Sequence, residues 1–485
     1  MTAASVRFPV SELRLHDDRV FDPEPSVRRI ARTLYDETRA LPLICPHGHV
    51  DPRWLASNDA FPEPASLLVT PDHYITRMLY SQGVPLESLG VRPRDGSAFE
   101  TDARQIWRRF AQGAHLFRGT PSGYWLDHEL HDVFGVRVAL SAESGDFVYD
   151  AIAERLPSPE FRPRALFDRF NIEVLATTDA ATDSLEHHAA IRNSGWHGRV
   201  IPTFRPDVLF NVTAADWSDS VGALEAQTGV RIDSVEALVA ALAVRRRVFC
   251  AAGATATDHG VEEPFTGSLS RDACTAIWQR AMNGVATYDD QRTLTGHLLL
   301  EMARLATQDG LVMQLHAGSH RNHNRPLFER FGADIGGDIP VATEFTKNLQ
   351  PLLNAYGNST DLTLLLFTLD ESTYTRELAP LAGHYPSVRL GPAWWFHDSI
   401  NGMTRYREWT TESAGIWNTA GFNDDTRAFC SIPARHDLSR RVDANVLARL
   451  VARHVIDLSD ARTMAHAMAY GLARATYKLG PAASL

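Results

Sequence analysis

From residue 172 onward, short apolar runs alternate with segments in which apolar residues recur every three or four positions. The first pattern is typical of buried parallel β-strands and the second of amphipathic helices. The predicted strands are IEVLATTD, RVIPTF, GATATD, LVMQLH, LTLLLFT, SVRLGPA and TAGFND, and an earlier apolar run opens PLICPHGHVDPRW at 42–54. Eight strands alternating with helices favour a closed (β/α)8 barrel over an open doubly wound sheet.

The remaining segments have helical patterns. Residues 26–41 predict a helix that leads into the first strand, and Asp72 is placed to cap another in PDHYITRMLY. Only helical patterns occur from about 101 to 170, and the chain from about 440 onward is again helical. We therefore predict three parts. Residues 1–80 form the N-terminal helix and first strand, 81–170 a helical insertion, and 171–485 the rest of the barrel with extra C-terminal helices.

Polar residues or tryptophans follow every predicted strand. Barrels of this kind place their chemistry at the carboxyl ends of the strands, so we predict a site at that mouth. The strand-end residues are His47 and His49, Thr178 and Asp179, Arg205, Asp258 and His259, His316, Asp370, Trp394 and Trp395, and Asp424 and Asp425.

The H-x-H pair, His47 and His49, is the first candidate for chemistry. Alternate side chains of an extended strand share a face, so both imidazoles could hold one cation. Pro46, Pro52 and Gly48 suit a strand-end loop better than a strand interior. Such a pair is more often merely hydrogen-bonded or exposed, and a metal needs further ligands.

Asp425 and His316 end the last and fifth strands and would face the same mouth. Singly, Asp425 could cap the next helix and His316 could be a core histidine. Together with the histidine pair they favour a metal site.

Three arginines from separate loops, Arg205, Arg321 and Arg427, would converge on this mouth. Guanidinium forks bind carboxylates, which suits an anionic substrate, although each arginine alone could form a surface salt bridge. One tryptophan of Trp394–Trp395 could lie against a sugar and the other pack in the core. Two further pairs could supply acid–base or hydroxyl-binding groups, or merely cap and pack: Asp258–His259 and His73–Tyr74.

Composition removes several other classes of function. The formal net charge of −11 and the lack of a basic tract argue against nucleic acid or anionic membranes as partners. No apolar run could span a bilayer and the start lacks an apolar signal core, so we expect a soluble cytoplasmic protein. The four cysteines are scattered, which indicates neither disulfides nor a thiolate zinc site. With only Lys347 and Lys478, a Schiff-base or phosphate-loop lysine has almost no candidate.

The chain resembles the uronate isomerase (glucuronate isomerase) family of the amidohydrolase superfamily. The matching pieces include PHGHVDPRW, PDHYITRMLYSQG, RFNIEVLATTD, TFRPD, TDHG, QLHAGSHRNHN, GPAWWFHDSINGM and GFNDDTRAFCSIPARHD. The resemblance implies a (β/α)8 barrel with an insertion after the first strand. The metal ligands it implies are His47, His49 and Asp425, with His316 as a candidate fourth. The substrate and catalytic residues it implies are His73, Tyr74, Arg205, Asp258, Arg321, Trp394, Asp425 and Arg427.

The sequence departs from related patterns at two points. Many members have a cysteine where this chain has Gly48, which should leave metal binding unaffected. Two-metal relatives in the superfamily use a lysine after the fourth strand, whereas this strand ends TATDHG. We therefore expect one divalent metal, Zn²⁺.

The activity that the resemblance implies interconverts D-glucuronate with D-fructuronate and D-galacturonate with D-tagaturonate. An enediol route needs a base, an electrophile and a proton shuttle, and hydride transfer stays open as a second route. A metal-dependent hydrolase and a non-catalytic sugar-acid binding protein are the alternative functions. We expect a small sugar acid as the substrate and a homo-oligomer as the assembly.

Overall fold

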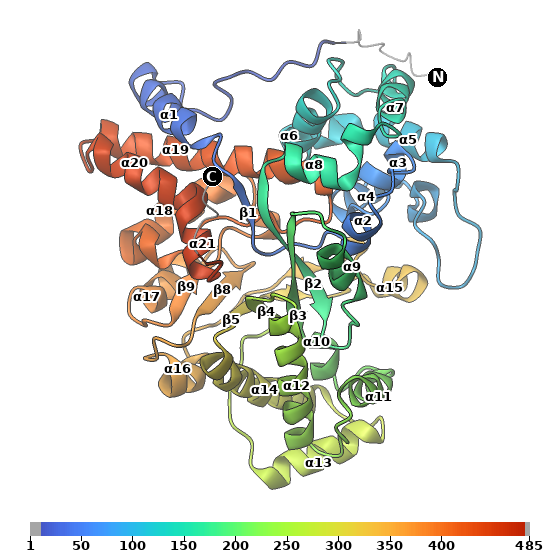
Figure 1. Ribbon diagram of the computed structural model, residues 1–485, viewed down its shortest axis with the longest axis vertical. Helices are drawn as coiled ribbons and strands as arrows, with labels where there is room; N and C mark the ends of the chain where they lie inside the picture. Colours follow the sequence, from blue (N-terminus) through green and yellow to red (C-terminus); the bar gives the residue numbers. More distant parts are fainter. Residues whose placement is uncertain (1–10, 481–485) are drawn as a thin grey trace.

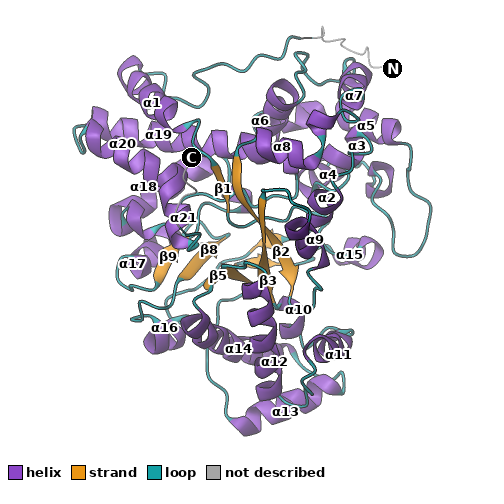
Figure 2. Ribbon diagram, viewed as in Figure 1, coloured by secondary structure: helices purple, strands orange, loops and turns teal. Residues whose placement is uncertain are grey.

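The computed structural model describes residues 11–480 and places a curled parallel sheet at the centre of the molecule, with helices around it (Figures 1 and 2). The sheet has seven strands in the order β1-β2-β3-β4-β5-β8-β9. All neighbouring pairs in it are parallel, as the apolar runs predict. The strands are β1 Leu43–Cys45, β2 Ile172–Ala180, β3 Arg199–Arg205, β4 Ala256–Val261, β5 Val312–Ala317, β8 Leu364–Thr368 and β9 Val388–Leu390.

The eighth predicted strand, TAGFND at 419–424, forms only a single bridge, between Thr419 and Leu390 of β9. Left-handed backbone follows, with φ of 79° at Gly421 and 39° at Asp425, and such angles interrupt the pleat of a strand. The carbonyl of Thr426 accepts a hydrogen bond from the amide of His49 at 2.9 Å. The segment is therefore hydrogen-bonded to β9 at one end and to the loop after β1 at the other, without being a strand.

β1 ends at Cys45, so the histidine pair lies in the loop just after the strand, as Pro46, Gly48 and Pro52 predict. Two other local predictions differ from the structure. β4 continues to Val261, which places Asp258 inside the strand. The polar loop predicted after β5 contains a two-stranded antiparallel ribbon, β6 Ser319–His320 and β7 Ile339–Pro340, with helix α15 Arg325–Phe331 between them.

The predicted helical insertion lies between β1 and β2, and its helices gather at the top and upper right of Figure 1, next to these two strands. Helix α1 precedes β1, and the Glu24 side chain caps its N-terminus by accepting the backbone N–H of Ser26. The helices of this part are α1 Pro25–Thr38, α2 Pro52–Ser57, α3 Pro64–Leu68, α4 His73–Tyr80, α5 Ala103–Gln112, α6 Pro121–His128, α7 Gly145–Ala153 and α8 Pro163–Arg169.

Helices follow most of the later strands, as the alternation predicts. The C-terminal helices start at 432, earlier than predicted, and pack against α1. The helices are α9 Glu186–Asn193, α10 Asp207–Phe210, α11 Trp217–Thr228, α12 Val235–Ala251, α13 Arg271–Met282, α14 Tyr288–Asp309, α16 Gln350–Tyr356, α17 Ala379–Ala382, α18 Ile400–Ala414, α19 Ile432–Ala452, α20 Leu458–His466 and α21 Leu472–Thr476.

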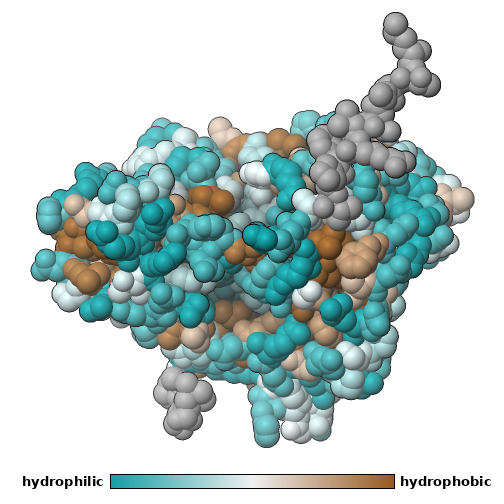
Figure 3. Space-filling model, turned by 90° about the horizontal axis from the view of Figure 1, so that it is seen from above, coloured by the Kyte–Doolittle hydropathy of each residue, from teal (hydrophilic) through white to brown (hydrophobic). Residues whose placement is uncertain are grey.

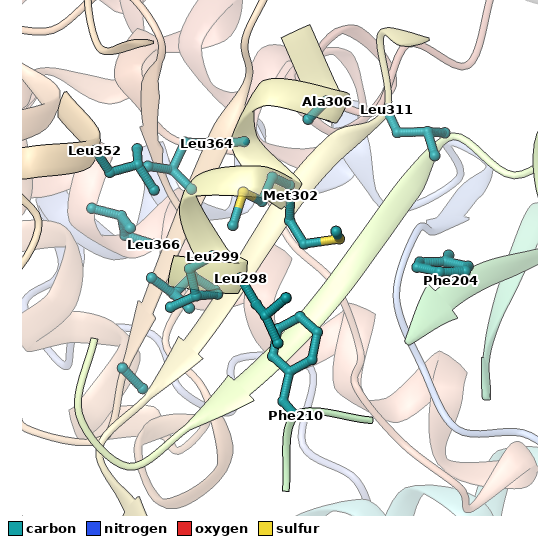
Figure 4. Packing of buried hydrophobic residues seen from close by; sticks show 14 of the residues in the cluster. Phe204, Phe210, Leu298, Leu299, Met302, Ala306, Leu311, Leu352, Leu364 and Leu366 are labelled. Atoms are coloured by element: carbon teal, nitrogen blue, oxygen red, sulfur yellow. The ribbon is translucent and has the colours of Figure 1, made fainter. Parts of the chain in front are cut away.

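The largest apolar cluster packs the later helices onto the outer face of the sheet. Leu298, Leu299 and Met302 of α14 are fully buried against Leu364 and Leu366 of β8 and their neighbours (Figure 4). In β1, Ile44 belongs to the cluster inside the curl and Cys45 to the cluster with the insertion helices. The sheet is therefore covered on both faces, which holds the ends of its strands in fixed positions.

The surface in Figure 3 is mostly polar, with separate apolar patches. Within residues 11–480, no helix combines the length and apolarity needed to cross a membrane. The four cysteines are all free thiols, as their scattered positions predict.

Candidate active site

A cavity of about 660 Å³ opens at the carboxyl ends of the strands. Its volume is in the range of small-molecule sites. All the residues selected from the sequence as metal, substrate or catalytic residues line it: His47, His49, His73, Tyr74, Arg205, Asp258, His316, Arg321, Trp394, Asp425 and Arg427.

Three of these side chains have the spacing of metal ligands. The Oδ1 atom of Asp425 lies 3.4 Å from Nε2 of His47 and 3.1 Å from Nε2 of His49. Zinc bonds of about 2.0–2.2 Å separate tetrahedral nitrogen and oxygen ligands by roughly 3.4 Å, so these gaps suit atoms that share an ion. Burial opposes ionisation of Asp425, but His47 and then His49 hold its pKa well below the usual value. The donor set therefore fits a divalent cation.

His316 lies beside this group without belonging to the same triad. Its Nδ1 is 2.7 Å from Oδ1 of Asp258, and its buried Nε2 has no hydrogen-bond partner among residues 11–480. Candidate donor atoms of His47, Asp258 and His316 all lie within 4.8 Å of one another. Burial lowers the pKa of His316, so it is neutral and able to donate a lone pair. The Asp258 contact also fixes the ring, as is usual for metal-ligating imidazoles.

Helix α4 presents His73 and Tyr74 to the cavity. The predicted cap is present, since Oδ1 of Asp72 accepts the backbone N–H of Tyr74 at 2.8 Å. Burial, followed by the nearby charge of Arg427, lowers the pKa of His73 to about 3. Burial and then Asp398 raise the pKa of Tyr74 well above its usual value. Both side chains are therefore neutral near pH 7.

The three arginines do converge, but each already has an acidic partner. Arg205 contacts two carboxylates, with Nε 2.7 Å from Asp207 and Nη1 3.3 Å from Asp258. Nη1 of Arg321 lies 2.8 Å from Asp338, and Nη2 of Arg427 lies 3.2 Å from Asp334. The side chain of Arg321 is 41 % exposed against 26 % for Arg205. Arg321 therefore has the more available fork.

Both tryptophans line the cavity, although both are largely buried. The Trp394 ring meets the His316 ring edge to face at 4.6 Å. The Trp395 ring contacts His73, and the Arg321 guanidinium lies 5.3 Å from its centre. Neither tryptophan is withdrawn from the cavity into a separate core, so both are available to shape a sugar site.

Several predicted strand-end groups lie outside the cavity. Asp179 contacts Thr177, His259 stacks on Phe210, and Asp370 accepts backbone N–H groups. Side chains alternate between the two faces of a strand, which accounts for Asp179 in β2 and His259 in β4. Capping of backbone N–H groups accounts for Asp370, so none of the three needs a role in chemistry.

Asp424 belongs to a second close group, with Cys45 and His436. The scattered cysteines indicated no thiolate metal site, so the sequence did not predict this group. Its three donors fall short of the four that structural zinc sites use. Gly48 is also less constrained than expected, because a Cβ there would meet its neighbours only at ordinary contact distances of 3.5 Å or more.

Sequence reasoning also missed the acidic partners of the arginines. Asp207 follows Arg205 by two positions in TFRPD, which could have indicated a pair. Asp334 and Asp338 lie in ADIGGDIP, a stretch with the composition of an ordinary solvated loop. The buried pair Asp398–Arg435, 37 positions apart in the chain, has no local pattern that would reveal it.

Comparison with known proteins gives matches over almost the whole chain. The family model described as glucuronate isomerase matches residues 26–476. A uronate isomerase of Brucella canis is 53 % identical over 467 residues, which are 96 % of this chain and 100 % of that protein. A uronate isomerase of Nostoc punctiforme is 54 % identical over 466 residues, covering 96 % and 98 %. The crystal structure of glucuronate isomerase from Caulobacter crescentus superposes with a TM-score of 0.95 at 49 % identity, covering 97 % and 98 %.

Proposed function

The chain belongs to the glucuronate isomerase family and isomerises uronates, and from this premise we propose which substrates it takes and how its residues act. The substrate pairs are D-glucuronate with D-fructuronate and D-galacturonate with D-tagaturonate. The observation that supports a sugar acid is the meeting of three arginines and two tryptophans in one cavity with an acid and a phenol.

In this proposal Arg321 receives the C6 carboxylate. Arg205 is bonded to Asp207 and Asp258 and is less exposed, so its role is to orient Asp258 for a sugar hydroxyl. Arg321 has one carboxylate partner and a fork that reaches the cavity. We therefore propose Arg321 rather than Arg205 for this role.

The chain's own groups can carry the protons of an enediol route. Asp425 is ionised and can accept the proton from C2, whose electrons form the C1–C2 double bond while O1 gains a proton. Delivery of a proton from the Asp425 carboxyl, where it can exchange with solvent, to C1, with loss of the O2 proton, completes the ketose. Tyr74, a neutral phenol, is suited to move a proton between O1 and O2, and Arg427 to stabilise the developing oxyanion.

One divalent cation, with zinc as the proposed identity, would be held by His47, His49 and Asp425, with His316 as an additional donor. When bound, it would supply Lewis-acid polarisation of a sugar oxygen.

The decisive experiment incubates purified protein with D-glucuronate and follows ketose formation, before and after prolonged chelation. Ketose formation supports the proposal. Binding without ketose would indicate a binding protein, and cleavage of a lactone or amide without action on uronates would indicate a hydrolase. With C2-deuterated substrate, complete retention of the label in the product with no exchange from solvent would count against the enediol route and favour hydride transfer, because a proton held on a carboxyl group can exchange with water.

We also propose that the segment 419–426 takes the place of an eighth strand and closes the barrel. Its hydrogen bonds to Leu390 and His49 support this arrangement. Four free thiols are in keeping with a reducing compartment, and we propose a cytoplasmic location. The homo-oligomer and the division at residues 80 and 170 stay predictions.

A further inference from the structure

A buried guanidinium lies directly behind the catalytic face of the cavity. Arg435 of α19 is 2 % exposed, and its charged end lies 3.6 Å from the centre of the Trp125 ring. Its Nη1 donates to Oδ2 of Asp398 at 2.9 Å and to the backbone carbonyl of Asp424 at 3.3 Å, and its Nε donates to Ser431 at 3.1 Å. Every one of these contacts fixes the guanidinium, because an Arg fork binds with a defined geometry.

Asp398 connects this guanidinium to Tyr74. It follows the two tryptophans of the cavity wall and is buried. Its Oδ2 accepts from the Tyr74 hydroxyl at 3.5 Å, which is at the long end for a hydrogen bond. Catalytic hydrogen bonds are often long before substrate binds. Within residues 11–480, Asp398 is the only group hydrogen-bonded to that hydroxyl.

The same guanidinium also reaches the other proposed proton carrier. The carbonyl of Asp424 that accepts from Arg435 belongs to the residue just before Asp425. One guanidinium therefore contacts both the carboxylate that accepts from Tyr74 and the peptide carbonyl that directly precedes Asp425.

We propose that Asp398, held by Arg435, is the positioning residue for the Tyr74 hydroxyl in the isomerisation. The inference rests on the proposed role of Tyr74. A carboxylate fixed on one side by a guanidinium presents its lone pairs in one direction, so it restricts the direction in which the Tyr74 O–H bond points. Loss of the carboxylate should therefore affect turnover rather than binding.

A second buried pair between neighbouring helices provides a matched control. Arg407 of α18 contacts Asp443 of α19 with Nε 2.7 Å from Oδ1 and Nη2 3.1 Å from Oδ2. Both members are buried as deeply as Arg435 and Asp398, and neither lines the cavity. Asp443→Asn thus removes a carboxylate from another buried Arg–Asp pair that involves α19, without touching Tyr74.

The test is a double-mutant cycle on kcat and KM for D-glucuronate. Tyr74→Phe should lower kcat by about 100-fold or more, as loss of a proton-transfer group does. Asp398→Asn should lower kcat by about 10- to 100-fold with KM changed by less than about 3-fold, and the double variant should match Tyr74→Phe to within about 3-fold. Asp443→Asn should leave kcat unchanged.

Multiplicative losses in the double variant, or an unchanged kcat in Asp398→Asn, would overturn the inference. So would a loss of kcat in Asp443→Asn equal to that in Asp398→Asn. If Asp398→Asn fails to fold, Arg435→Lys keeps the charge but loses the fork, and it should show the same kcat-specific loss. The wild-type assay distinguishes failure of the proposed function from failure of this inference. Absence of ketose with the wild type would contradict the proposed function, whereas an active wild type with unaffected Asp398→Asn would contradict only the positioning role.

Discussion

Replacing Arg321 by methionine tests which arginine binds the substrate carboxylate. A hydrogen bond to a charged group contributes about 1.5–3 kcal/mol when the pair is buried. Because the Arg321 side chain is 41 % exposed, solvent screening favours the lower end. About 1.5 kcal/mol corresponds to roughly a tenfold rise in KM, with kcat nearly unchanged since the carboxylate is distant from C1 and C2.

The assay compares D-glucuronate with D-glucuronamide, which has the same shape without the charge. Arg321→Met should reduce the preference for the acid by about tenfold, and Arg321→Lys should recover part of it. Arg325→Met is the matched control, because Arg325 lies four positions further on, is 80 % exposed and pairs with Glu329. It should change neither kinetic constant.

An unchanged KM for D-glucuronate in Arg321→Met would refute the assignment. An equal loss for acid and amide would refute it too, since it would indicate a disturbed loop. Loss of Arg321 could also disturb this loop, because its partner Asp338 accepts the backbone N–H of Asn322 at 2.7 Å. A thermal melt of the variant therefore belongs to the experiment.

Three further predictions concern the metal, a buried acid and the core. Asp425→Asn should lower the metal bound per chain by about tenfold or more in elemental analysis, whereas Asp443→Asn should not. Burial raises the pKa of Glu129 to about 8, so the unfolded chain loses this proton first, and stability should fall as pH rises from about 4.5 to 8. In urea denaturation, Glu129→Gln should exceed the wild type at pH 8.5 and match it near pH 4; equal midpoints at both would contradict this. Leu298→Ala in α14 should cost about 2–5 kcal/mol of unfolding free energy, with kcat retained at 25 °C.

The alternation of strands and helices was predictable because buried parallel strands need near-continuous apolar runs. Seven runs form the sheet in the predicted order along the chain. The run at 419–424 did not become a strand, since its backbone turns left-handed at Gly421 and Asp425. Local sequence cannot indicate that a non-glycine residue such as Asp425 adopts this conformation, because contacts from distant parts of the chain stabilise it.

The side chains of the cavity were predictable to the extent that they follow strand ends or a capped helix. His47, His49 and Arg205 were found that way, and Tyr74 through the cap by Asp72. The strand-end prediction failed where β4 ran on to Val261, because alternation within the strand then placed His259 beside Phe210, outside the cavity. The residues that support the site come from elsewhere in the chain, and only the folded arrangement brings them together.

The acidic partners of the arginines change how substrate selection is understood. The sequence suggested a positive pocket in a chain of net charge −11. The structure instead pairs Arg205 with Asp258, Arg321 with Asp338 and Arg427 with Asp334, so a carboxylate already faces each of these guanidinium groups before substrate enters. A uronate that engages Arg321 must compete with a carboxylate already bonded to it. The contribution of this contact to binding is then the difference between two similar ion pairs, which keeps it modest.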